Sequence, residues 1–237
     1  MKIELIQHLN NKNEIQLNGL FNEIIEFGEF NSIIFNDSKK AIIETIKTIP
    51  VFGMIVGTTW QIYNDRKEKL QLCKLLLGFC EQFSKIDKNK IDYDYLKTDE
   101  FYLLFKKVLE KVRLESREDK IKLFRNFILN STKNSEKFKK VDKRYLLDKL
   151  DLLNLDNMKI LKWYKDNNYD HIQETYQYSH KRTEMLKEFV FAGELENDLV
   201  VAGFLSDNSA GRLGGGKYFV LTSLGKIFYD FIQHDEI

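Results

Sequence analysis

The stretch DLVVAGFLSDNSAGRLGGGKYFVLTSLGKIFYDFI, residues 198–232, decides the fold of the C-terminal part of the chain. It starts in the end of a helix and passes into a short apolar run that suits a strand. Asn208 to Gly216 are rich in glycine and predict a hairpin tip, and a second strand-like run ends at Leu221. Thr222 can cap the amphipathic helix that follows, because its hydroxyl accepts a hydrogen bond from an N-terminal helix N–H. This order of helix, strand, glycine-rich tip, strand and helix predicts a small β-hairpin between two helices.

The phrase YFVLTSLG, residues 218–225, resembles the Y-x-L-T-x-x-G close of the wing in many bacterial winged-helix proteins, with one more residue between Tyr218 and Leu221 than that pattern has. The resemblance covers no more than the last third of the chain. It implies a winged-helix-like domain over residues 143–237. It also implies that the helix before the wing, residues 194–201, takes the place from which such proteins read the major groove of DNA.

That helix is acidic, because Glu194, Glu196 and Asp198 are its charged residues and it has no Lys or Arg. A like-charge contact at about 4 Å costs roughly 1 kcal/mol even in water, and the guanine contacts of Arg and Lys are missing. We therefore expect the domain to bind protein partners, other proteins or copies of itself. The overall layout also resembles uncharacterised helical proteins of bacterial phage-defence loci, which implies a regulatory or defence role without an enzyme activity.

A DNA-binding regulator is the second hypothesis, since basic residues lie before the domain and beside the hairpin tip. The candidate phosphate contacts are Lys137, Lys139, Lys140, Lys143, Arg144, Arg212 and Lys217. Lys dominates the basic residues, because only seven of the 37 are Arg. A solvated lysine surface is therefore the plainer explanation of this cluster.

The N-terminal part follows the apolar period of helices. The helical windows are residues 13–29, 38–49, 66–86, 101–113 and 118–130. We expect a mainly α fold, with an α-helical domain over residues 1–130 and a basic linker over residues 131–142. In the C-terminal domain we expect two short helices within residues 143–167, with Asp156 and Asn157 as turn and N-cap. Residues 167–180 are expected to be irregular, and Gly193 to separate two further helices.

Residues 48–64 carry no charge, and Pro50 is expected to break the helix before them. We expect this run to form either a buried helix or a subunit contact, in which Gly53 and Gly57 admit a neighbouring backbone, and its apolar length favours association of copies. The candidate contacts are Ile49, Val51, Phe52, Gly53, Ile55, Gly57 and Trp60. A helical effector that acts on membranes through residues 42–62 is a third hypothesis. The run disfavours it, because a membrane span needs about 20 apolar residues.

Composition limits the other function classes. The 237 residues carry a formal net charge of +1, which indicates neither a nucleic acid nor an anionic membrane as the partner. Cys73 and Cys80 lie seven residues apart on one predicted helix, which suits buried thiols but not a disulfide or a zinc site. Residues 1–10 lack the apolar region of a signal peptide, so we expect a cytoplasmic protein.

No motif in the sequence carries recognisable chemistry. The string GRLGGGKY, residues 211–218, nearly matches a phosphate-binding loop, but Tyr218 replaces the Ser or Thr that would hold magnesium, and a strand rather than a helix follows. The four histidines have no metal-ligand spacing, and no nucleophile motif is present. We therefore expect no catalytic residues, no metal, no cofactor and no small-molecule substrate.

Overall fold

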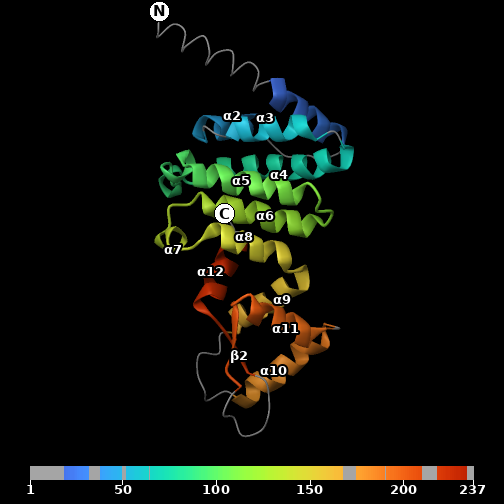
Figure 1. The fold of residues 1–237 in the computed structure, drawn as a ribbon, viewed down its shortest axis with the longest axis vertical. Helices are drawn as coiled ribbons and strands as arrows, with labels where there is room; N and C mark the ends of the chain where they lie inside the picture. Colours follow the sequence, from blue (N-terminus) through green and yellow to red (C-terminus); the bar gives the residue numbers. More distant parts are fainter. Residues whose placement is uncertain are drawn as a thin grey trace, which may run out of the picture. The chain divides into compact units, whose positions relative to one another are not determined.

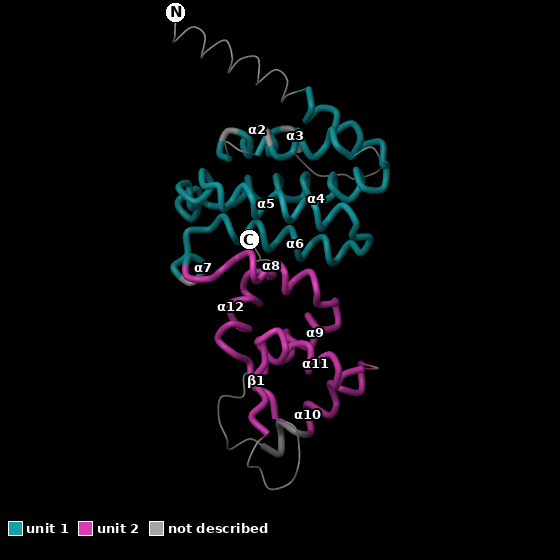
Figure 2. Tube along the Cα trace, in the orientation of Figure 1, with its two compact units in different colours: residues 1–139, 235–237 teal, residues 140–234 magenta. Residues whose placement is uncertain are grey.

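The computed structural model describes residues 19–31, 38–49, 52–63, 65–167, 175–189, 191–209 and 218–233. The chain forms two compact units, which Figure 2 colours separately. Unit 1 comprises residues 1–139 with 235–237, and unit 2 comprises residues 140–234. The division falls between Lys139 and Lys140, within the segment expected to be a linker. Part of that segment is folded, because residues 136–139 form a short helix that buries Phe138.

Unit 1 is a helical bundle. After a helical segment over residues 19–30, its helices are α2 (Ser38–Thr48), α3 (Phe52–Ile62), α4 (Arg66–Ser84), α5 (Asp99–Val112), α6 (Glu118–Ser131) and α7 (Glu136–Lys139). In Figure 1, α2 and α3 form one layer, α4 and α5 the next, and α6 lies on their other side. α4 packs against both α2 and α6, so it is buried on two faces.

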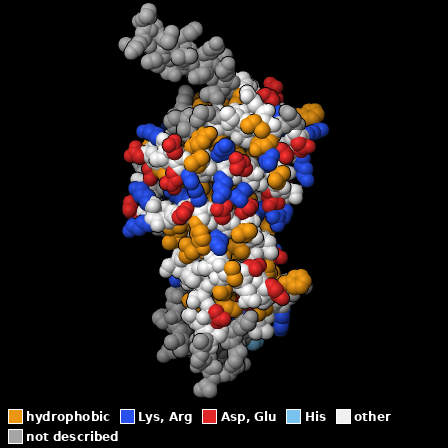
Figure 3. Space-filling model, viewed as in Figure 1, with side chains coloured by type: hydrophobic (Ala, Val, Ile, Leu, Met, Phe, Trp, Pro, Cys, Tyr) orange, Lys and Arg blue, Asp and Glu red, His pale blue; other side chains and the backbone are white. Residues whose placement is uncertain are grey.

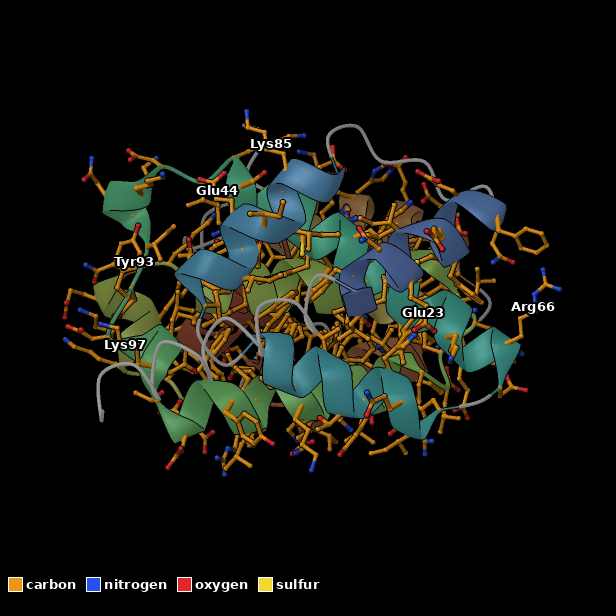
Figure 4. The ribbon with its side chains drawn as sticks, turned by 90° about the horizontal axis from the view of Figure 1, so that it is seen from above. Glu23, Glu44, Arg66, Lys85, Tyr93 and Lys97 are labelled. Carbon is orange, nitrogen blue, oxygen red and sulfur yellow. The ribbon has the colours of Figure 1, made fainter. Side chains whose placement is uncertain are left out.

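Phenylalanine rings fill the centre of unit 1. Phe52 of α3 lies 5.8 Å from Phe21, 5.8 Å from Phe79 and 5.5 Å from Phe105, measured between ring centroids. These contacts join four helical segments across the bundle, and apolar burial of this kind is the main stabilising contribution to a helical core. Figure 4 looks down on this bundle, with Glu23 and Arg66 toward one end and Tyr93 and Lys97 toward the other.

The connection between α4 and α5 is ordered by backbone pairing. Two 3₁₀ turns, Lys88–Lys90 and Tyr95–Lys97, flank Ile91, which forms an antiparallel bridge with Lys133. The N–H of Asp92 donates to the Thr132 carbonyl at 2.8 Å, and that of Asn134 to the Lys90 carbonyl at 2.7 Å. The polar run predicted to be a simple connection is therefore tied to the end of α6.

Unit 2 packs around one central helix. Its helices are α8 (Lys143–Leu152), α9 (Leu155–Asp166), α10 (Thr175–Lys187), α11 (Ala192–Val201) and α12 (Ser223–Ile232). The strands β1 (Leu205–Asp207) and β2 (Phe219–Leu221) pair antiparallel, with Leu205 opposite Leu221. α9 contacts α11, α12 and β2, and α11 also contacts α10 and β1. The predicted mainly α fold with a small hairpin near the C-terminus is confirmed.

Short hydrogen bonds fix both ends of the hairpin. Gly203 ends α11 in the left-handed region at φ 81°, and its N–H donates to Val200 while that of Phe204 donates to Leu199, the pattern of a Schellman cap. Thr222 caps α12, because its hydroxyl accepts from the Gly225 N–H at 2.9 Å, and it also donates to the Gly203 carbonyl at 2.7 Å. The T-x-x-G of the sequence thus joins α11 to α12.

Three local predictions are corrected. Residues 175–180 are helical rather than irregular, since α10 begins at Thr175. Gly193 lies inside α11 instead of separating two helices. The N-cap of α9 is Asn154, whose side chain accepts from the Asn157 N–H, so Asp156 and Asn157 lie in the first turn. Among the described residues, no helix is long and apolar enough to cross a membrane.

Gly225 and Gly193 provide a matched pair of substitutions. A Cβ atom at Gly225 would lie 2.3 Å from the Phe204 carbonyl oxygen, whereas one at Gly193 would have nothing within 4 Å. We expect Gly225→Ala to lower the free energy of unfolding by about 1–3 kcal/mol, because backbone must move to relieve the clash. Gly193→Ala should raise it by up to about 1 kcal/mol through helix propensity. Urea unfolding followed by circular dichroism measures both, and equal effects would contradict the packing described.

The two cysteines are buried free thiols, as predicted, and burial raises the pKa of each from 9.0 to about 12. The thiolate is the reactive form, so we expect Cys73 and Cys80 to resist iodoacetamide at pH 8 in the folded chain and to react fully in urea. Because the folded pKa is the higher one, their contribution to stability is complete below pH 9 and is lost as the pH rises from about 9 toward 12. Mass spectrometry of the alkylated chain tests this, and rapid labelling without denaturant would contradict it.

Candidate functional site

The apolar segment predicted to be a subunit contact forms part of the core of unit 1. Ile49, Phe52, Ile55 and Trp60 are all buried within the single chain, and Gly53 is buried as well. A Cβ at Gly57 would lie 3.3 Å from the side chain of Leu20, so this glycine admits a neighbour from the same unit. Val51 lies outside the described residues. Of the two expected roles, the structure shows the buried helix, because the rings of the core cover the segment, and these buried side chains are not open for a subunit contact.

The predicted phosphate contacts do not form one described surface. Lys139, Lys140 and Arg144 are exposed, and Lys139 pairs with Glu136 at 3.3 Å. Lys143 is only 6% exposed, so it is corrected from a surface contact to a buried side chain at the start of α8. The side chain of Lys137 lies outside the described residues, as do Arg212 and Lys217.

The acids of α11 are not equivalent. Glu194 and Asp198 are exposed, but Glu196 is 0% exposed and belongs to the core of unit 2. This corrects the expectation that three carboxylates of this helix face outward. The reason is a partner that is distant in sequence, Arg182 of α10, for which no local pattern gives a signal.

Arg182 and Glu196 form a buried ion pair with two hydrogen bonds. The Arg182 Nε donates to Glu196 Oε1 at 2.8 Å, and a second guanidinium nitrogen donates to Oε2. The Tyr164 hydroxyl of α9 donates to Oε1 at 2.6 Å, and the guanidinium lies over the ring of Phe219 at 5.3 Å. The group therefore joins α9, α10, α11 and β2.

The charges of Arg182 and Glu196 compensate each other inside unit 2, so both groups have a structural role. The Arg182 side chain is 13% exposed, and burial alone would lower its pKa. Hydrogen bonds and charge attraction to Glu196, with a contribution from Tyr164, outweigh burial and raise that pKa above its ordinary value. Arg182 stays charged at any physiological pH, so the pair fixes the orientation of α11 and offers no proton for catalysis.

The burial of Glu196 leaves a defined outward surface on α11. We call it the α11 face, and it consists of Phe191, Glu194, Asn197, Asp198 and Val201, all exposed. Phe191 is 65% and Val201 81% exposed, so a large apolar side chain stands at each end of the helix. Sequence reasoning missed these two residues. A signal was available for Val201, which lies on the side of the helix away from the buried Leu195 and Leu199, but not for Phe191, which is the N-cap of α11.

The described residues offer little else that could act as a site. No group of three or more His, Cys, Asp or Glu side chains within them is placed to hold a metal ion. Cys73 and Cys80 are buried with raised pKa values, which makes them unsuitable as nucleophiles. On the side of unit 2 visible in Figure 3, hydrophobic and acidic side chains are evident, while unit 1 shows basic and acidic side chains interspersed. The α11 face is therefore the candidate site.

Comparisons with known proteins add no relative. No family model, no curated protein and no solved structure matches this chain.

The buried Arg182–Glu196 pair predicts that two glutamates of α11 contribute very differently to the free energy of unfolding. We expect Glu196→Ala to lower the free energy of unfolding by about 3–5 kcal/mol, because it leaves the Arg182 charge buried without its partner. Glu194→Ala, the matched control on the exposed side, should change it by less than about 0.5 kcal/mol. Urea unfolding measures both.

Two further variants separate the pair from its neighbours. The double variant Arg182→Met/Glu196→Leu should lose less stability than Glu196→Ala alone, since no charge is then left unpaired. Tyr164→Phe should cost only about 1 kcal/mol, the contribution of one hydrogen bond. If Glu196→Ala and Glu194→Ala unfold at the same urea concentration, Glu196 does not have the structural role described.

Proposed function

We propose that the chain is a non-enzymatic cytoplasmic protein whose unit 2 is a winged-helix-like module that binds a protein partner through the α11 face. The observation that carries this proposal is the composition of that face. It presents two carboxylates, one amide and two exposed apolar side chains, and it has no Lys or Arg. The layout similarity to phage-defence proteins makes bacterial defence or regulation the setting of the proposal.

The chemistry of the α11 face suits a protein better than a nucleic acid. Protein interfaces bury aromatic and aliphatic side chains at their centre and place charges at the rim. Phe191 and Val201 supply such apolar anchors, and Glu194 and Asp198 supply charges of one sign between them. A phosphate backbone would meet only negative charge on this face, and no guanidinium or ammonium group of α11 could pair with a guanine.

The winged-helix part of the proposal is supported by the order and packing of the elements. α10, α11, β1, β2 and α12 follow one another, and α11 contacts β1 as the helix before a wing would. The Leu221-Thr222 pair ends β2 and caps α12, and Gly225 packs directly on the Phe204 carbonyl. These roles explain why the motif needs a capping hydroxyl and a residue without a side chain at those two positions.

DNA binding is the second candidate, and one observation favours it. The burial of Glu196 removes one of the three acids that were expected to repel a duplex, and Lys140 and Arg144 of the same unit are exposed. Phosphate contacts from such residues would be independent of sequence and strongly dependent on salt. This candidate requires a contact from outside the α11 face.

In-cell crosslinking tests the proposal. A photoreactive benzoylphenylalanine in place of Asn197, at the centre of the α11 face, should give discrete protein adducts on irradiation. Replacement of Lys162, an exposed residue of α9, is the control and should not give them. The purified chain should leave the fluorescence anisotropy of a labelled DNA duplex unchanged at low salt. A salt-dependent DNA complex without adducts at position 197 would replace the proposal with the second candidate.

A further inference from the structure

The spacing of the apolar residues on the α11 face and the charge between them define which partner surface fits it. Phe191 and Val201 lie ten residues apart, which corresponds to roughly 15 Å along a helix, or about three turns. Glu194 and Asp198 lie between them and give the face a formal charge of −2. A partner that fits must therefore offer two apolar positions about three helical turns apart, with positive charge between them.

Unit 1 carries a surface of that description on α5. We call it the α5 face, and it consists of Leu103, Lys106, Lys107, Glu110, Lys111 and Leu114. Leu103 is 44% and Leu114 69% exposed, and they lie eleven residues apart, roughly 17 Å along a helix. Leu114 follows Arg113, whose backbone is still helical, so it continues this side of α5. Three lysines and one glutamate give the intervening surface a formal charge of +2.

We propose that the partner of the α11 face is the α5 face of a second copy of this chain, an inference that rests on the proposed function. The apolar positions of the two faces have nearly the same spacing, and the charges between them are equal and opposite. Phe191 and Val201 can each meet one leucine, with Glu194 and Asp198 opposite lysines. Charges arranged in this way set the register of the two helices and increase the rate of association.

The contact joins two different surfaces, so it is heterologous. One copy contributes a face of unit 2 and the next contributes a face of unit 1, so an open assembly always keeps one unoccupied α11 face and one unoccupied α5 face, at its two ends, for further neighbours unless a ring closes. The association is therefore expected to grow with concentration beyond a dimer, and to weaken as salt screens the exposed charges.

Paired charge reversals test the inference. One variant is Glu194→Lys/Asp198→Lys, and the other is Lys106→Glu/Lys107→Glu. The control is Glu26→Lys/Glu29→Lys, which changes the charge by the same amount as the first variant at exposed positions of the segment over residues 19–30. Sedimentation velocity from about 1 to 100 µM measures association, and circular dichroism checks that each variant is folded. We expect wild type and control to associate, and each reversed variant to remain near the monomer mass of 28.2 kDa, with affinity lowered about tenfold or more.

The mixture of the two reversed variants is the decisive sample. Each reversed face then meets the complementary reversed face of the other variant, while the unchanged faces still match, so association should return. A wild type that stays monomeric, reversed variants that associate as wild type does, or a mixture that stays monomeric would each overturn the assignment. If the wild type is monomeric while position 197 still crosslinks to a different protein in cells, only the second-copy assignment fails. If neither is seen, the proposed function fails with it.

Discussion

The buried ion pair between Arg182 and Glu196 is the constraint on which unit 2 depends. It connects α10 to α11, and through Tyr164 and Phe219 it also includes α9 and β2. A buried carboxylate is tolerated only where its charge and hydrogen-bonding capacity are met, so these elements have one arrangement that satisfies it. That arrangement turns Glu194, Asp198 and the terminal apolar residues of α11 outward.

The helical part of the fold was predictable because its signals are local. Apolar residues at helical spacing marked α4, α5 and α6, and the capping hydroxyl of Thr222 is observed where it was expected. The errors came where local signals compete. Asn154, Asp156 and Asn157 are all suitable N-caps, and the reciprocal bonds of Asn154 and Asn157 decided the start of α9. A glycine between two polar-apolar helical windows predicts a break at Gly193, but this residue needs no positive φ and α11 includes it.

The candidate site was harder to predict, because exposure is a property of the whole unit. The sequence showed that α11 is acidic, yet it gave no sign that Arg182, fourteen residues earlier, removes Glu196 from the surface. The apolar run of α3 suggested an uncovered surface, since a sequence does not show how many rings the rest of the bundle supplies. Phe191 and Val201 were overlooked because single apolar residues at helix ends are common, and only their shared exposure makes them notable.

The bond between Thr222 and Gly203 has a mechanical consequence. Gly203 ends α11, Thr222 starts α12, and the Phe204 carbonyl between them accepts from the Thr222 N–H at 3.0 Å while Gly225 lies against it. A force applied to the last turn of α11 therefore reaches the first turn of α12 without passing along the hairpin. A partner bound to α11 therefore acts on α11 and α12 together.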